Sequence, residues 1–102
     1  MTELEERIRG AKAQLTTAQA ATTAAFRARD KALLEARAAL VTYNAERSEG
    51  NGAAVARTRN ELERARLAVA QAQAAQIMLG DELVRAMLDE QEGGDVRCRT
   101  TL

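Results

Sequence analysis

The sequence predicts an all-α fold, a long antiparallel helical hairpin built as a two-helix coiled coil. Three observations predict it: 23 of the 102 residues are alanine, none is proline, and one cluster of turn-forming residues interrupts the middle of the chain. Ala, Leu, Glu and Arg favour helices and proline breaks them, so two long helices are expected. Aromatic residues make up only 2% of the chain, which disfavours a β or α/β core.

The first helix is expected over residues 2–48. Thr2 followed three residues later by Glu5 fits a capping box, in which each side chain satisfies a free backbone N–H. The turn is expected at residues 48–52, Ser-Glu-Gly-Asn-Gly, whose glycines can adopt left-handed conformations and whose asparagine can cap the next helix.

The second helix is expected over residues 53–92, ending at Gly93-Gly94. The hairpin then occupies residues 1–92, and residues 93–102 form a flexible C-terminal tail. Gly80-Asp81 offers an alternative, because a glycine inside a helix costs about 1 kcal/mol relative to alanine. In that alternative the second helix breaks there and a short third helix follows.

A turn centred near residues 50 and 51 places residue i close to residue 101 minus i in the partner helix. Leu40 then lies near Leu62 and Leu33 near Val69. The same register brings acidic residues of the second helix beside basic residues of the first. These are Asp89, Glu90 and Glu92 on one side and Arg7, Arg9 and Lys12 on the other.

Apolar periodicity indicates which residues form the core. In the second helix Val55, Leu62, Val69, Gln76 and Leu83 recur every seven residues, which is a coiled-coil pattern. In the first helix the large apolar residues are spaced by eleven and then by seven, which predicts a change of twist near Phe26. The predicted hairpin core consists of Leu15, Phe26, Leu33, Leu40, Val55, Leu62 and Val69.

The sequence predicts no enzyme, cofactor or metal site. It has no histidine for general-base work, a single serine in the turn, and no glycine-rich phosphate loop. Asp89, Glu90 and Glu92 do not converge on one point, so a solvated helix end is favoured over a cation site. Cys98 lies between two arginines that favour its thiolate, but a lone cysteine in a tail is the simpler interpretation.

The end of the second helix is apolar over a wider arc than one partner helix can cover. Because a two-helix rod buries little surface, self-association or docking on another protein is predicted. A smaller second stripe, Leu34 and Val41, lies on the first helix. The predicted protein interface consists of Ile77, Met78, Leu79, Leu83, Val84, Met87 and Leu88.

The favoured function is therefore that of a non-enzymatic structural or interaction protein, a helical-hairpin subunit of a larger assembly such as a phage particle or a secretion apparatus. The alternative is a small regulator or inhibitor that binds a nucleic-acid enzyme, or nucleic acid itself, through arginine-rich helix faces. The arginines concerned are Arg57, Arg59, Arg64 and Arg66. Nucleic acid is the less favoured partner, because the formal net charge is zero and Glu61 and Glu63 lie within reach of these arginines.

The expected location is the cytoplasm, with incorporation into a virion or other large assembly. No apolar run approaches the length of a membrane span, and the first residues are acidic where a secretory signal would be basic. The single cysteine cannot form a disulfide within the chain. The Trp-x-Gly turn of the WXG-type helical hairpins is absent, because Ser48-Glu49-Gly50 stands in the turn instead.

Overall fold

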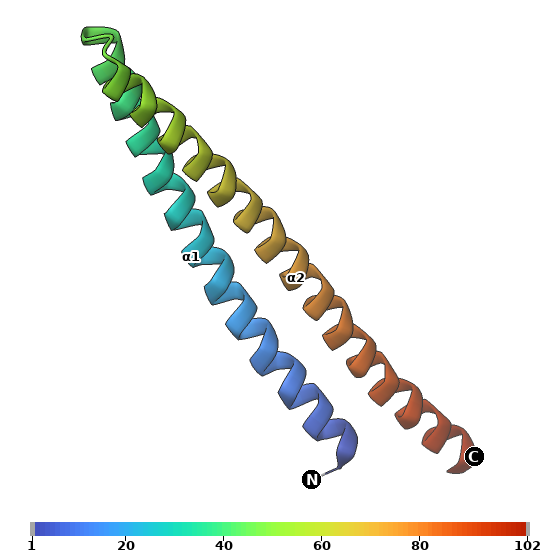
Figure 1. The fold of residues 1–102 in the computed structure, drawn as a ribbon. Helices are drawn as coiled ribbons and strands as arrows, with labels where there is room; N and C mark the ends of the chain where they lie inside the picture. The colour runs from blue at the N-terminus through green and yellow to red at the C-terminus, as the bar shows by residue number, and fades with distance from the viewer. Residues whose placement is uncertain (1, 102) are drawn as a thin grey trace. The chain divides into compact units, whose positions relative to one another are not determined.

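The computed structural model describes the backbone of residues 2–101 and the side chains of residues 2–91. Two helices, α1 (Glu3–Ala45) and α2 (Glu49–Thr101), form an all-α helical hairpin. A three-residue connection at residues 46–48 reverses the chain direction between them (Figure 1). The fold class predicted from composition is thus confirmed.

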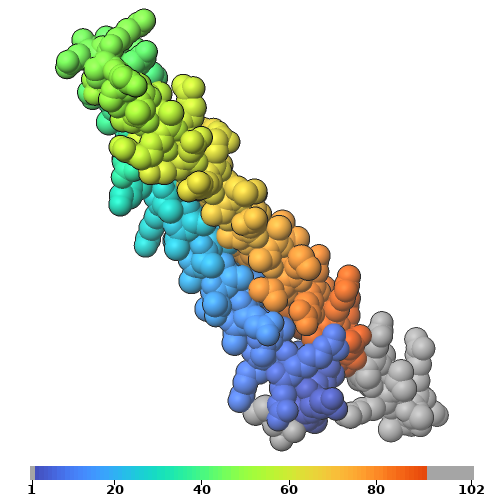
Figure 2. Space-filling view, viewed as in Figure 1, coloured from blue at the N-terminus to red at the C-terminus, as the bar shows by residue number. Residues whose placement is uncertain are grey.

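The hairpin consists of two compact units. The first, called here the terminal unit, combines residues 1–20 of the N-terminal end with residues 74–102 of the C-terminal end. The second, called the turn unit, comprises residues 21–73 and includes the connection between the helices. In the space-filling view α1 and α2 are in contact within the turn unit (Figure 2).

Helix α1 begins with one of the two hydrogen bonds of the predicted capping box. The hydroxyl Oγ1 of Thr2 accepts a hydrogen bond from the backbone N–H of Glu5 at 3.1 Å. This bond satisfies one of the backbone donors that the first helical turn leaves free. Acidic side chains in that first turn add a favourable interaction with the helix dipole.

The connection between the helices is shorter than expected and lies earlier in the chain. Ser48 caps α2, because its Oγ accepts a hydrogen bond from the N–H of Asn51 at 3.1 Å. Asn51 Nδ2 in turn donates to the carbonyl oxygen of Glu46 at 2.7 Å. Gly50 and Gly52 belong to the first turn of α2, and no described glycine has a positive φ. The expected turn at 48–52 with left-handed glycines is therefore wrong.

Helix α2 is also longer and more regular than expected. It continues through Gly80-Asp81 without a break, so the alternative with a third helix is wrong. Its backbone remains helical to Thr101 and does not end at Gly93-Gly94. The side chains of the expected tail, including Cys98, lie outside the described residues.

The residues of α2 that face α1 recur at alternating spacings of three and four, as predicted. Such spacing is the heptad pattern of a coiled coil, and we call these positions the seam. Leu62 and Val69 are its large buried residues. The buried or half-buried α2 seam is Asn51, Val55, Thr58, Leu62, Ala65, Val69, Ala72, Gln76, Leu79, Leu83 and Ala86.

In α1 the seam is different from the predicted one. It keeps the same heptad spacing over its whole length, so it does not show the change of spacing from which a change of twist near Phe26 was predicted. Its members are mostly small: Leu4, Ile8, Ala11, Leu15, Ala18, Thr22, Ala25, Arg29, Ala32, Ala36, Ala39 and Tyr43. Phe26, Leu33 and Leu40 each follow a seam alanine directly and therefore lie beside the seam. Small seam residues allow two helices to approach closely without voids.

The register differs from the expected one by one heptad. In the turn unit Thr22 Oγ1 donates a hydrogen bond to the carbonyl oxygen of Ala72 at 3.3 Å, and these residue numbers add to 94 where 101 was expected. The earlier turn explains the shift, because moving the centre of a hairpin by half a heptad moves the pairing by a whole one. Because a shift of one heptad pairs seam positions with seam positions again, the predicted heptad positions of α2 still face α1.

The predicted hairpin core is only partly enclosed. Leu15, Phe26, Leu33 and Val55 are half-buried, and Leu40 is exposed. The guanidinium of Arg29 lies 4.8 Å from the centre of the Phe26 ring, which is a cation–π contact. No large side chain among the described residues is fully buried. Two helices alone thus enclose a narrow core.

Candidate protein-interaction surface

All seven residues of the predicted interface lie in the terminal unit, where the structure separates them. Leu79 and Leu83 are half-buried seam positions that face α1. They therefore belong to the packing of the hairpin itself. Ala86, the next seam residue along α2, is fully buried. The remaining five residues are exposed on α2, and they do not share a single face.

Four of them lie on one side of the helix, and we call them the outer stripe: Ile77, Val84, Met87 and Leu88. Their exposed fractions are 65%, 54%, 43% and 50%. Ile77 and Val84 are seven residues apart, whereas Met87 and Leu88 follow Val84 at three and four. These spacings bring side chains together on one side of a helix. Two acidic residues border the stripe: Asp81 lies between Ile77 and Val84 along the helix, and Glu90 follows Met87 by three residues.

Met78 is the most exposed of the predicted residues, at 72%, and it lies away from the outer stripe. One residue along a helix corresponds to a rotation of about 100°. Met78 lines a groove of about 650 Å³ together with residues of both helices of the terminal unit. The groove is lined by Arg7, Ala75, Met78, Leu79, Asp81, Glu82 and Arg85. Its mixed lining carries charges of both signs.

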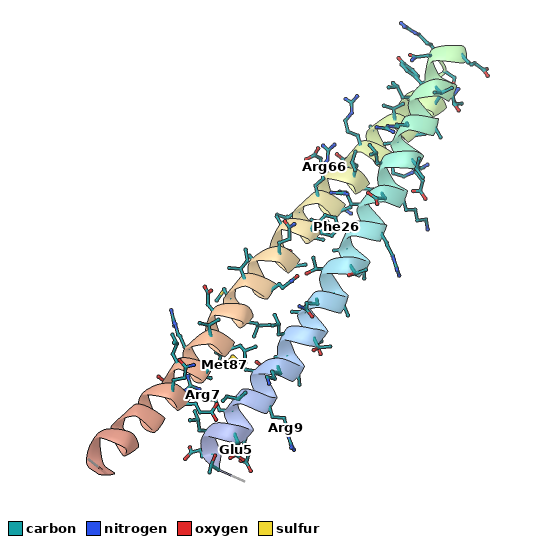
Figure 3. All side chains as sticks on the ribbon, turned by 180° about the vertical axis from the view of Figure 1, so that it is seen from behind. Glu5, Arg7, Arg9, Phe26, Arg66 and Met87 are labelled. Atoms are coloured by element: carbon teal, nitrogen blue, oxygen red, sulfur yellow. The ribbon has the colours of Figure 1, made fainter. Side chains whose placement is uncertain are left out.

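An ion pair links α1 to α2 in the terminal unit. The guanidinium of Arg7, labelled in Figure 3, lies 2.8 Å from the Asp89 carboxylate. This contact confirms the predicted proximity of Arg7 and Asp89. Both side chains are about half exposed, and ion pairs of this kind contribute about 0–1 kcal/mol. The pair therefore aligns the helices without contributing much stability.

The turn unit has a groove of its own between α1 and α2, with a volume of about 170 Å³. Leu40, Val55 and Leu62 form its apolar floor, beside Ala36. Arg37 from α1 and Arg59 from α2 also line it, and no acidic side chain does. We call this feature the arginine groove. Sequence reasoning missed it, because Arg37 and Arg59 become neighbours only once the register of the helices is known.

The four arginines predicted as an alternative nucleic-acid site lie on two faces of α2. Arg57 and Arg64 are seven residues apart and share one face, and Arg59 and Arg66 share another. Arg66 is paired with Glu63 at 3.2 Å. Arg57, Arg59 and Arg64 are exposed and form no ion pair with a described residue.

Further exposed apolar residues lie in the turn unit. Leu34 and Val41, seven residues apart on α1, form the small second stripe that the sequence indicates. Leu67 on α2 is also exposed, and sequence reasoning missed it. A signal was present, because Leu67 does not fit the heptad positions of the α2 seam.

The described residues contain no group of three or more histidine, cysteine, aspartate or glutamate side chains that could hold a metal ion. Of the acidic residues weighed as a cation site, Glu92 has its side chain outside that part of the chain. Within the described residues no helix combines the length and the apolar character of a membrane span.

Comparison of the chain with protein-family models, with curated proteins and with solved structures gives no match.

Proposed function

We propose that this protein is a non-enzymatic structural or interaction protein, a helical-hairpin subunit that binds protein through the C-terminal half of α2. It associates with itself or docks into a larger assembly, of which a phage particle or a secretion apparatus is an example. Such a subunit is made in the cytoplasm and enters the assembly from there.

The observation that carries this proposal is the outer stripe. Four large apolar side chains lie on one side of one helix, and each is at least 43% exposed. Single exposed leucines are ordinary on protein surfaces, whereas several large apolar side chains on one side of a helix favour a site of protein association. A helix that presents such a face docks into the groove of a partner, with anchors at spacings of three, four and seven residues.

Photo-crosslinking at the outer stripe tests the proposal. A photoreactive amino acid replaces Val84, which is exposed at the centre of the stripe, and the protein is irradiated in the cells that make it. We expect a covalent adduct with one defined protein, because the stripe buries its apolar area against that partner. Gel electrophoresis and mass spectrometry then identify the adduct.

The matched control carries the same photoreactive residue at Ala13, which is exposed on α1 of the same unit. We expect little adduct at this position. Equal labelling at both positions, or no defined adduct at Val84, would show that the outer stripe is not an interface.

The second candidate function is nucleic-acid binding through the arginine faces. The observation in its favour is that Arg57 and Arg64 share a face and have no ion-pair partner among the described residues. Binding to phosphates weakens steeply with ionic strength because condensed counterions are released. Fluorescence anisotropy with labelled single- and double-stranded oligonucleotides at several salt concentrations tests this candidate. Apolar association does not show that steep dependence.

A further inference from the structure

The two units of the hairpin carry opposite net charge. The turn unit holds nine basic and six acidic residues, a net charge of +3. The terminal unit holds six basic and nine acidic residues, a net charge of −3. The formal net charge of zero for the whole chain conceals this separation. Opposite charge on two surfaces favours their association and suppresses contacts between like surfaces.

Each unit also presents an apolar surface that fits the charge of the other unit. In the terminal unit two carboxylates border the outer stripe: Asp81 lies between Ile77 and Val84 along the helix, and Glu90 follows Met87 by three residues. In the turn unit the arginine groove is lined by apolar side chains together with Arg37 and Arg59, and by no acidic residue. An apolar helix face bordered by carboxylates therefore complements an apolar groove whose lining includes two arginines and no acidic residue.

The exposed area of the chain indicates how large a partner is needed. The chain exposes 7788 Å², whereas a compact monomer of 11.0 kDa exposes about 5600 Å². A protein–protein interface of standard size buries about 800 Å² on each partner. The excess, about 2200 Å², is ample for a helical partner and exceeds what a small ligand can cover.

We propose that the partner is a second copy of this chain, and that the outer stripe of one copy packs over the arginine groove of the other. This inference rests on the proposed function and names its partner. Each copy carries both surfaces, and the proposed pairing is reciprocal, with the stripe of each copy on the groove of the other about a two-fold axis. The assembly closes as a dimer of about 22 kDa, twice the mass of the chain. The contact buries the apolar stripe, and the charges select the pairing of unlike units.

A charge-reversal cycle tests this dimer. One variant carries Asp81→Lys and Glu90→Lys, which changes the terminal unit from −3 to +1. The other carries Arg37→Glu and Arg59→Glu, which changes the turn unit from +3 to −1. Each variant alone gives both units the same sign, so we expect its dimer dissociation constant to rise by about tenfold or more. A chain with all four substitutions restores unlike units and returns to within about threefold of the wild type.

Sedimentation equilibrium measures the dissociation constants, and light scattering after size exclusion measures the mass. A monomeric wild type, or an open polymer in place of a closed dimer, overturns the proposal. It is also overturned if either two-substitution variant dimerises as well as the wild type, or if the four-substitution chain recovers nothing. Circular dichroism shows that each variant is helical, and recovery in the combined chain excludes simple misfolding.

The Val84 crosslink distinguishes this failure from failure of the proposed function. An adduct of about 22 kDa containing only this chain supports the dimer. An adduct with a different protein overturns the dimer but leaves the proposed function in place. The absence of any defined adduct overturns both.

Discussion

Glycine residues within the helices show how single positions limit the stability of the hairpin. Gly10, Gly50 and Gly80 all lie inside helices, and none has a neighbouring atom within 4 Å of the place where a Cβ would stand. Glycine in a helix is unfavourable because it loses more backbone entropy on folding than other residues. None of these positions needs the left-handed conformation that glycine permits.

Replacing Gly10 by alanine should stabilise the protein. Gly10 lies in the interior of α1 with open space around it, so Gly10→Ala should raise the free energy of unfolding by about 0.5–1 kcal/mol. Urea denaturation followed by circular dichroism measures the change. Gly52→Ala is the matched control, because its new Cβ would lie 3.4 Å from the Tyr43 ring. The control should gain less, and a larger gain at Gly52 than at Gly10 would contradict this account.

Buried alanines explain why sequence reasoning placed one helix better than the other. In α2 the seam contains Leu62 and Val69, whose size makes the heptad pattern visible. In α1 the corresponding positions include Ala11 and Ala32, which are buried but are too small to stand out among 23 alanines. Sequence reasoning therefore followed the large residue Phe26 and its neighbours, which lie beside the seam.

At the scale of the element, the turn determines the register of the whole hairpin. Sequence reasoning read Gly50 and Gly52 as turn residues because glycine is common in turns. The hydroxyl of Ser48 and the amide of Asn51 bond to the backbone, however, and the helix already begins at Glu49. Side-chain caps thus outweighed the low helix propensity of two glycines. This choice between two plausible turns is not decided by local sequence alone.

Removing the cap of α2 should destabilise the hairpin. Ser48→Ala deletes the hydroxyl that accepts a hydrogen bond from the N–H of Asn51. The loss of such a cap lowers the free energy of unfolding by about 1 kcal/mol. Thermal unfolding followed by circular dichroism measures the loss. Thr2→Ala removes the equivalent cap of α1, at the chain end. Helix ends fray, so Thr2→Ala should cost less. Equal effects of the two substitutions would show that the cap at the turn has no special role.

On the scale of the whole molecule, the sequence could predict which region of α2 has unpaired apolar residues, but not which of those residues lie on the same face. The sequence shows that the end of α2 is too apolar for one partner helix, and the exposure of Ile77, Val84 and Leu88 agrees with that expectation. It did not separate these residues from Leu79 and Leu83, which face α1. Which of these residues face α1 depends on the position of the seam on α2. An apolar arc wider than one partner helix can cover does not determine that position.

The stability of the protein should depend on its concentration. No described large side chain is fully buried within one chain, so burial of the outer stripe in an assembly should contribute to folding by mass action. The midpoint of thermal unfolding should rise by about 3–5 °C for each tenfold increase in protein concentration. Calorimetry or circular dichroism over two decades of protein concentration measures this change in the midpoint.

A chain with Val84→Glu and Leu88→Glu should lose this dependence, because charged side chains cannot be buried without partners. These positions are chosen over Leu83 because a charge on the seam would damage the hairpin itself. The control Ala13→Glu adds a charge on α1 of the same unit and should keep the dependence. A midpoint that is independent of concentration in the wild type would mean that the hairpin is stable without association.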